Sequence, residues 1–318
     1  MKRYVLHILI GIALCLQACH SDLETEEMAI GMAATSVEST TRALINSAAD
    51  LQNFRVDAYK KGTSNEQVFS KHLVERNGTE WKYSPVRYWD RKATYYFGAY
   101  SPENTTVSTT DTKGVLTISA PNWQAIDGKE TDIVVATSQG AATGYIGVDA
   151  GTVKFDFEHI LAQLEVQIVR NATLLNTYTL TGLSYEQVPE GDGKSDYTFN
   201  YNYATPSSSV MNSTATGTKA VYSGAVVVDP VAKPGTTFKH LVVPFSTQEQ
   251  GGMLVAVTYK VGSGDPTTID VKTNISTLEA GKRYVLTLTF NSGANIIPDL
   301  SVCGWAKEEV DEDDKYNW

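Results

Sequence analysis

The sequence predicts an all-β protein with little helix, built from β-sandwiches. With 318 residues, of which 42% are hydrophobic, the chain is long enough for two domains. Charged residues make up only 19%, while Thr, Ser, Val, Tyr and Gly are abundant, a mix that favours strands and turns over helices. Short apolar alternations recur along the chain between Gly, Pro, Asn and Asp turn signals, which is typical of sandwiches.

The first half of the chain contains several such alternations. Phe54, Val56 and Ala58 alternate with polar residues, as in a half-buried strand. Asn77-Gly78 between two strand-like segments predicts a hairpin with a type I′ turn, because both residues accept positive φ angles. The strands predicted in this half cover residues 54–58, 68–76, 79–83, 95–100 and 132–137.

The second half continues the same pattern. Tyr284, Leu286 and Leu288 give the clearest alternation, since all three would point to one face of a sheet. The predicted strands cover residues 153–157, 164–169, 177–183, 220–228, 237–244, 253–261 and 284–290. Two segments rich in Gly, Ser, Pro and Asp, at residues 189–195 and 205–218, are predicted to be loops. We expect one domain at residues 43–152 and a second, with a tail, at 153–318.

The start of the chain is predicted to be a lipoprotein signal peptide. Lys2 and Arg3 precede an apolar run at residues 4–18, which is too short for an ordinary transmembrane helix. The run ends in Leu16-Gln17-Ala18-Cys19, which resembles a bacterial lipobox and makes Cys19 the residue that carries the palmitate. The alternative is an ordinary signal peptide with an incidental cysteine. The acidic stretch behind it, at residues 20–27, is similar to the surface-export signal of Bacteroidetes lipoproteins.

Composition and motifs exclude several function classes. The net charge of −10 and the pI near 5.0 argue against nucleic-acid binding, which needs a basic surface. Two of the three cysteines lie in the signal segment, so no disulfide framework is expected. The histidines are scattered without ligand spacing, and neither a Gly-x-Ser-x-Gly elbow nor a His-Glu-x-x-His motif occurs. We therefore expect no enzyme, no metal and no cofactor; a secreted hydrolase is the weakest alternative.

A dense block of aromatic residues lies between Trp81 and Tyr100. Trp81, Tyr88 and Trp89 could stack on sugar rings, which would make the chain a surface glycan-binding lipoprotein. The other interpretation is that these rings fill a sandwich core, because aromatic residues dominate core burial. The two interpretations differ in a simple observable, which is the burial of the rings.

The segment at residues 20–42 is predicted to be an acidic tether followed by a strand. Met28, Ile30 and Met32 alternate, and the strand is joined to the body through the bond between Arg42 and Ala43. One cut by an arginine-specific protease at that bond would release the strand. The alternative is a simple linker arginine.

Several motifs, in order along nearly the whole chain, resemble the fimbrillin family of Bacteroidia, the subunits of type V pili. Trp81-Lys82-Tyr83, Tyr88-Trp89 and Phe97-Gly98-Ala99-Tyr100-Ser101-Pro102 resemble that family's aromatic run. Phe157-Glu158-His159-Ile160-Leu161-Ala162 resembles its F-x-H-x-L-A motif, and Ala280-Gly281-Lys282-Arg283-Tyr284 its A-G-K-x-Y. We expect His159 to be a structural residue at the domain junction.

The resemblance implies two tandem transthyretin-like β-sandwich domains and a structural pilus subunit that serves cell adhesion and biofilm formation. The precursor would reach the cell outer membrane as a lipoprotein, lose its first strand to an arginine-specific protease, and join other subunits in a surface fimbrium. Leu300 and Val302 mark the candidate donor strand that would fill a neighbour's groove. Host or bacterial surface ligands are further candidate partners. Stalk, tip and anchor positions stay open, because residues 307–315 are mostly charged and fit a donor strand poorly.

Overall fold

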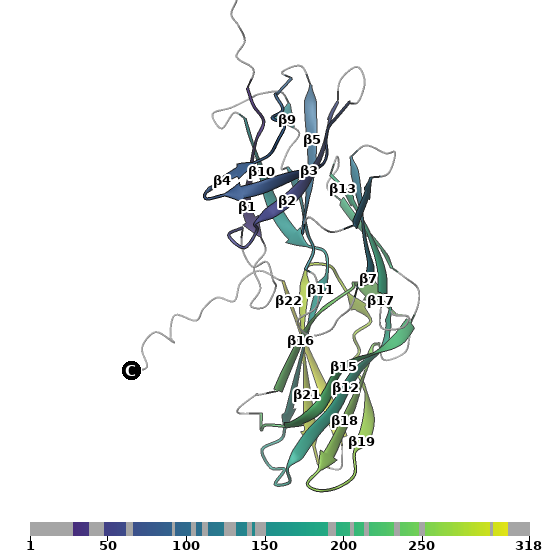
Figure 1. Ribbon diagram of the computed structural model, residues 1–318. Helices are drawn as coiled ribbons and strands as arrows, with labels where there is room; N and C mark the ends of the chain where they lie inside the picture. The colour runs from purple at the N-terminus through teal and green to yellow at the C-terminus, as the bar shows by residue number, and fades with distance from the viewer. Residues whose placement is uncertain are drawn as a thin grey trace, which may run out of the picture.

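The computed structural model is elongated, with one group of sheets above another (Figure 1). It describes residues 28–37, 48–61, 66–90, 93–102, 106–109, 114–123, 132–138, 142–143, 151–189, 195–203, 207–212, 216–231, 236–247, 252–292 and 295–304. All 22 elements in these ranges are strands, which confirms the all-β prediction. No helix suited in length and apolarity to crossing a membrane occurs within these ranges.

The upper lobe is organised around one eight-stranded sheet. Its order is β1 (Gly31–Val37), β10 (Thr152–His159), β8 (Val134–Ser138), β5 (Thr94–Ser101), β2 (Asn53–Lys61), β3 (Glu66–Asn77) and β4 (Glu80–Lys82), and the short β9 (Ala142–Thr143) also pairs with β5. Alternation sends Phe54, Phe97 and Phe155 to one face, where they form a buried aromatic cluster. We call this cluster, with the other residues packed in it, the upper core.

A second sheet covers the opposite face of the eight-stranded sheet. It comprises β14 (Ser207–Asn212), β13 (Ser195–Asn202), β7 (Val115–Trp123) and β6 (Thr106–Thr109), in that order. Leu116, Ile118 and Phe199 from this sheet are buried in the same cluster as Tyr59 and Tyr100. The eight-stranded sheet therefore buries apolar side chains on both of its faces.

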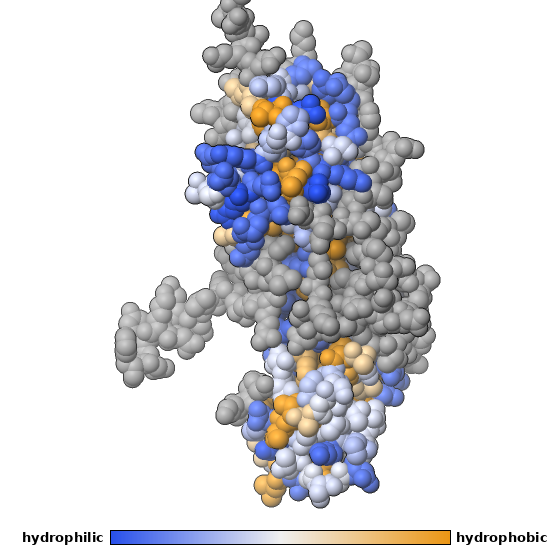
Figure 2. Space-filling model, in the orientation of Figure 1, coloured by the Kyte–Doolittle hydropathy of each residue, from blue (hydrophilic) through white to orange (hydrophobic). Residues whose placement is uncertain are grey.

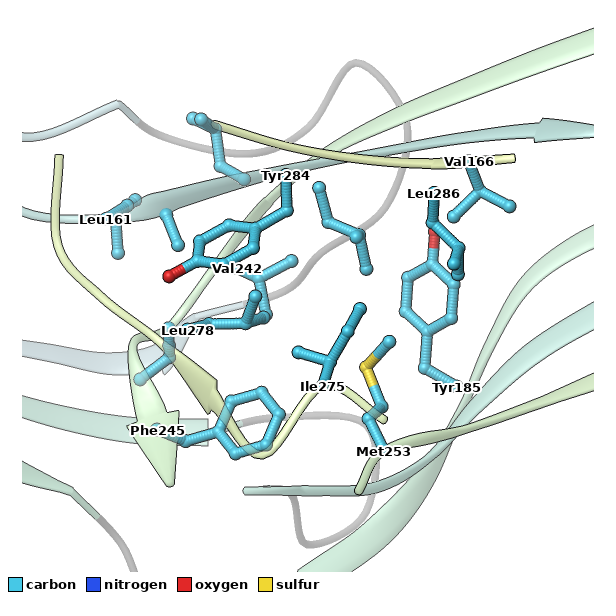
Figure 3. Close-up of a cluster of buried hydrophobic side chains, with 14 of the residues drawn as sticks. Leu161, Val166, Tyr185, Val242, Phe245, Met253, Ile275, Leu278, Tyr284 and Leu286 are labelled. Atoms are coloured by element: carbon cyan, nitrogen blue, oxygen red, sulfur yellow. The ribbon is translucent and has the colours of Figure 1, made fainter. Parts of the chain in front are cut away.

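The lower lobe is a sandwich of two four-stranded sheets. One sheet is β16 (Thr236–Val242), β11 (Ala162–Arg170), β21 (Lys282–Asn291) and β22 (Asn295–Gly304); the other is β15 (Thr216–Val227), β12 (Tyr178–Pro189), β18 (Leu254–Val261) and β19 (Thr267–Lys272). In Figure 3, Tyr284 and Leu286 of the first sheet face a core that includes Tyr185 of the second. The short pair β17 (Phe245–Ser246) and β20 (Thr277–Leu278) brings Phe245 and Leu278 to the same core.

Strand pairing crosses the predicted division at 152/153 in two places. β10 begins at Thr152 but pairs with β8 and β1 of the upper sheet. The hairpin of β13 and β14 follows β12 of the lower lobe, yet β13 pairs with β7 of the upper one. The division into two domains at that point stays a prediction, and the sheets themselves are not contiguous in sequence.

Most predicted strands are present, with two corrections. The hairpin between β3 and β4 turns at Gly78 and Thr79, with Asn77 paired to Glu80, and of these four residues only Gly78 has a positive φ, of 66°. A type I′ turn centred on Asn77-Gly78 is therefore wrong, and glycine at the first turn position is the type II′ pattern. Residues 205–218 are not only a loop, because β14 lies within them and pairs with β13.

Candidate functional site

The first strand lies in a slot at the edge of the upper sheet. β1 pairs in parallel with β10, from Gly31 opposite Thr152 to Val37 opposite Phe157. On its other side the backbone N–H of Ile30 donates to the Arg87 carbonyl at 2.8 Å. We call the space between β10 and residues 87–89 the first-strand slot; residues 28–37 fill it.

The first strand supplies apolar side chains to the upper core. Ile30 is 1% exposed and Met32 is 5% exposed, and both are part of that core. Val37 is buried there as well, and Ala34 packs against it. Loss of these residues would uncover the rings that line the slot, among them Phe155 and Phe157. Fully burying one such aliphatic side chain stabilises a fold by about 1.5–3 kcal/mol, so the strand is an integral part of this lobe.

Polar groups fix the first strand along its length. The Tyr83 hydroxyl donates to the Ile30 carbonyl at 2.7 Å, and burial raises the pKa of this hydroxyl, which keeps it a neutral donor. The Trp89 backbone N–H donates to the Met28 carbonyl at 2.9 Å. The Thr35 hydroxyl donates to the Phe155 carbonyl at 3.2 Å and also contacts the Asp156 carboxylate. These bonds fix the register of the strand in the slot.

The strand expected around Met28, Ile30 and Met32 is present in the structure, whereas the residues expected to be lipidated and cut lie outside the described ranges. Met28, Ile30 and Met32 all lie in the slot, Met28 half-buried and the other two buried. Cys19, Arg42 and Ala43 fall outside the described residues. Lipidation and cleavage there stay predictions.

The candidate donor residues lie in β22 at an edge of the lower lobe. Among the described strands, β22 pairs only with β21, in antiparallel register from Asn295 to Gly304. Leu300 is half-buried against the core between the two sheets of the lower lobe, while Val302 is 52% exposed. In this position the strand completes its own sheet, and its exposed edge ends at Gly304, where the described chain also ends.

The aromatic block is mainly core and not an open platform. Trp81 packs against Phe54 with ring centroids 4.9 Å apart, and Trp89 packs against Tyr95 at 4.8 Å. Both tryptophans are half-buried against the upper core, and of the three candidate stacking residues only Tyr88 is exposed, at 49%. Figure 2 shows a mostly hydrophilic surface around β3 and β4. Burial of the rings is the outcome expected for a sandwich core.

His159 forms a buried pair with Asp132 where the upper and lower lobes meet. Its Nδ1 lies 2.8 Å from Asp132 Oδ1, and both side chains are 0% exposed. β10 ends at His159, and β11 of the lower lobe begins three residues later. His159 therefore lies where the upper sheet leads into β11 of the lower lobe. Among the described residues no His, Cys, Asp and Glu side chains group as a metal site would require.

Sequence reasoning missed the residues that shape the slot. Gly151 accepts a backbone hydrogen bond from Gly31, and its own φ is 111°, a conformation that favours glycine. Tyr83 was noted only as part of the aromatic run, and Arg87 was not singled out. The available signal was Ala150-Gly151-Thr152 immediately before an alternating strand, since glycine at such a point marks a close backbone approach.

Asp57 is a buried carboxyl between the upper sheet and its cover. It is 2% exposed, and its Oδ1 accepts hydrogen bonds from Gln67 Nε2 at 2.8 Å and from the Lys71 backbone N–H at 3.4 Å. Burial raises the pKa of Asp57, and these hydrogen bonds only partly offset that effect. Burial also raises the pKa of the neighbouring Tyr203 hydroxyl, with the Asp57 charge adding to it.

The variant Asp57→Asn is expected to be more stable than the natural chain at pH 8. The folded-state pKa is raised, so the ionised carboxyl destabilises the fold above that pKa, whereas both states are neutral below the ordinary pKa of about 3.9. The difference in Tm between the variant and the natural chain should therefore shrink as the pH falls toward 4. Asn keeps a side-chain oxygen that can accept from Gln67, so the substitution removes the charge without removing that hydrogen bond. Thermal unfolding from pH 8 to pH 4 measures this. A difference that stays constant or grows on acidification would contradict it.

Comparison with known proteins places the chain in a family. Its fold resembles that of a fimbrial protein from Bacteroides vulgatus, with a TM-score of 0.64 and 15% identity over 88% of this chain and 100% of the other. Two proteins named for cell adhesion, from Bacteroides uniformis and Bacteroides ovatus, reach a TM-score of 0.54 at 18% and 14% identity, each over 89% of this chain and 99% of the other. None of the curated proteins matches the chain. The model of the fimbrillin-like family matches residues 41–305, so the chain belongs to that family.

Proposed function

We propose that this chain is a structural subunit of a surface fimbrium, assembled by strand exchange after its first strand has been removed. The observation that carries the proposal is the first strand itself, which buries Ile30, Met32 and Val37 in the upper core. It lies at a sheet edge, ahead of the Arg42–Ala43 bond, so one cut would separate it from the body. Membership of the fimbrillin-like family and fimbrial relatives of the same fold support the same role.

The physical drive for assembly is the groove that removal would leave. A sheet edge with unpaired amides and an uncovered apolar face strongly favours taking up another strand. If each subunit accepts a strand at its upper lobe and gives one from its C-terminal region, around Leu300 and Val302, the contact is head-to-tail. Such contacts do not close and therefore grow filaments. In this proposal other fimbrial subunits are the partners, and adhesion and biofilm formation are what the filament serves.

The cellular location of the precursor and of the mature subunit follows from the same assembly scheme. The precursor is held at the outer membrane by lipid on Cys19, and cleavage by an arginine-specific protease frees the mature subunit for the surface fimbrium. A tip subunit would accept a strand without donating one, and an anchor subunit would keep its lipid. The glycan-binding alternative gains no support from Trp81 and Trp89, which are half-buried in the upper core.

The test is digestion of the purified, non-lipidated chain with an arginine-specific protease, followed by intact mass and native gel. We expect an early cut after Arg42, loss of the first strand and growth of ladders. The variant Arg42→Lys keeps the charge but removes the cleavage site, so it should stay monomeric. A chain that is cut after Arg42, loses the first strand and still stays monomeric would contradict strand exchange.

A further inference from the structure

The first-strand slot is tightest at Gly31. A Cβ atom added there would lie 2.7 Å from Thr152 Oγ1, 3.1 Å from the Gly151 carbonyl oxygen and 3.2 Å from Thr152 Cα. The nearest of these atoms is the end of the Thr152 side chain, and the other two are backbone atoms in tight contact, so an added Cβ would press first on Thr152. Glycine fits because it brings no side chain to this close approach.

The wall opposite Gly31 is itself fixed by glycine. Gly151 has φ of 111°, and a Cβ there would lie 3.2 Å from the Met28 sulfur and 3.3 Å from the Ala29 carbonyl oxygen. The Gly31 N–H donates to the Gly151 carbonyl, which draws the two backbones together. A strand that replaces the first strand in the same register meets the same constriction.

The slot also demands apolar residues on both sides of that glycine. Ile30 and Met32 are buried in the upper core, so an incoming strand must present an apolar–Gly–apolar triplet. Only five of the 24 glycines in the chain have apolar neighbours on both sides. They are Gly11, Gly31, Gly98, Gly147 and Gly304.

Four of these five triplets cannot be donated. The triplets of Gly11 and Gly31 precede Arg42 and leave with the cut. Gly98 lies within β5, which is held between β2 and β8. Gly147 lies in the connection from β9 to β10, so both of its ends are tied to the acceptor sheet. The fifth, Cys303-Gly304-Trp305, begins with the last two residues of the edge strand β22, which is paired with β21 on one side.

We propose that the slot selects its incoming strand by this glycine, and that Cys303-Gly304-Trp305 of a second copy of this chain takes the positions of Ile30-Gly31-Met32. The inference rests on the proposed strand exchange. The same alignment places Val310 at the position of Val37, whereas Lys307 and Glu308 replace Ala34 and Thr35. The selective contact is therefore the triplet, and it explains how a tail that is mostly charged after residue 306 still donates.

The test compares ladder growth after arginine-specific cleavage for single variants of the full chain. Gly304→Ala adds the Cβ that the slot excludes, and we expect the assembly rate to fall by about tenfold or more, as strained over-packing would produce. The matched control Ser301→Thr adds a methyl group to the same strand outside the triplet and should assemble like the natural chain. Tm before cleavage shows whether either change disturbs β22 itself.

A suppressor variant distinguishes a clash inside the slot from damage to the fold of the donating subunit. Thr152→Ala removes the nearest of the three wall atoms, so combining it with Gly304→Ala should recover much of the lost rate. If the natural chain is cut and does not assemble, the proposed function itself fails. If it assembles and Gly304→Ala assembles equally fast, or if Thr152→Ala gives no recovery, strand exchange stands and selection by the glycine is overturned.

Discussion

Asp132→Ala is expected to lower the free energy of unfolding by about 1–3 kcal/mol, because it removes a buried hydrogen-bond partner of the His159 ring. Asp132 and His159 both have side chains that are 0% exposed, and their atoms lie 2.8 Å apart. The Ile160 backbone N–H donates to the Ile133 carbonyl beside them, so the pair is part of the contact between the approach to β8 and the end of β10. The loss should appear as a lower midpoint in urea unfolding.

Two further variants give this prediction its controls. Asp265→Ala removes a carboxylate from an exposed turn and should change stability by less than about 0.5 kcal/mol. Asp132→Asn keeps an acceptor for the ring N–H without the charge, so its cost should fall between the two. If Asp132→Ala were as mild as Asp265→Ala, the pair would not be holding the junction.

The strands that the sequence predicts well are those whose alternation is local. Tyr284, Leu286 and Leu288 point to one face of β21, as the period of two requires. β13 and β14 were not predicted: the Ser-rich β14 looks like a loop when read alone, whereas the alternation of Tyr197, Phe199 and Tyr201 in β13 was a local signal that was missed. They become strands by pairing with each other and with β7, about 80 residues away in sequence. Which strand β13 pairs with leaves no signal in the local sequence.

The candidate site was predictable in part for the same reason. The alternation of Ile30 and Met32 predicts a strand, and both residues are buried. The parallel pairing with β10 joins residues about 120 positions apart, and no local pattern specifies it. The Tyr83 hydroxyl reaches the Ile30 carbonyl across 53 positions, so it too depends on the completed fold.

Phe155→Ala is expected to destabilise the upper lobe by about 3–5 kcal/mol, the usual cost of truncating a buried phenylalanine. Phe155 is 0% exposed, and its ring centroid lies 5.5 Å from that of Phe54 and 6.4 Å from that of Phe97. It is paired in register with Ala34 of the first strand. The cavity would therefore open directly beneath the strand that the proposed protease step removes.

The matched control is Phe290→Ala in the lower lobe. Phe290 is also 0% exposed, and its ring packs 4.7 Å from Tyr259 and 5.3 Å from Tyr178, so its truncation should cost a similar amount. Hydrogen exchange distinguishes the two variants. Phe155→Ala should speed exchange of the β1 amides, because local opening of the strand costs less once its partner ring is gone, whereas Phe290→Ala should leave them near their natural rate. Equal acceleration of β1 by both variants would mean that the two lobes unfold as one cooperative unit, and that the first strand gains no independent freedom from the loss of its own core contacts.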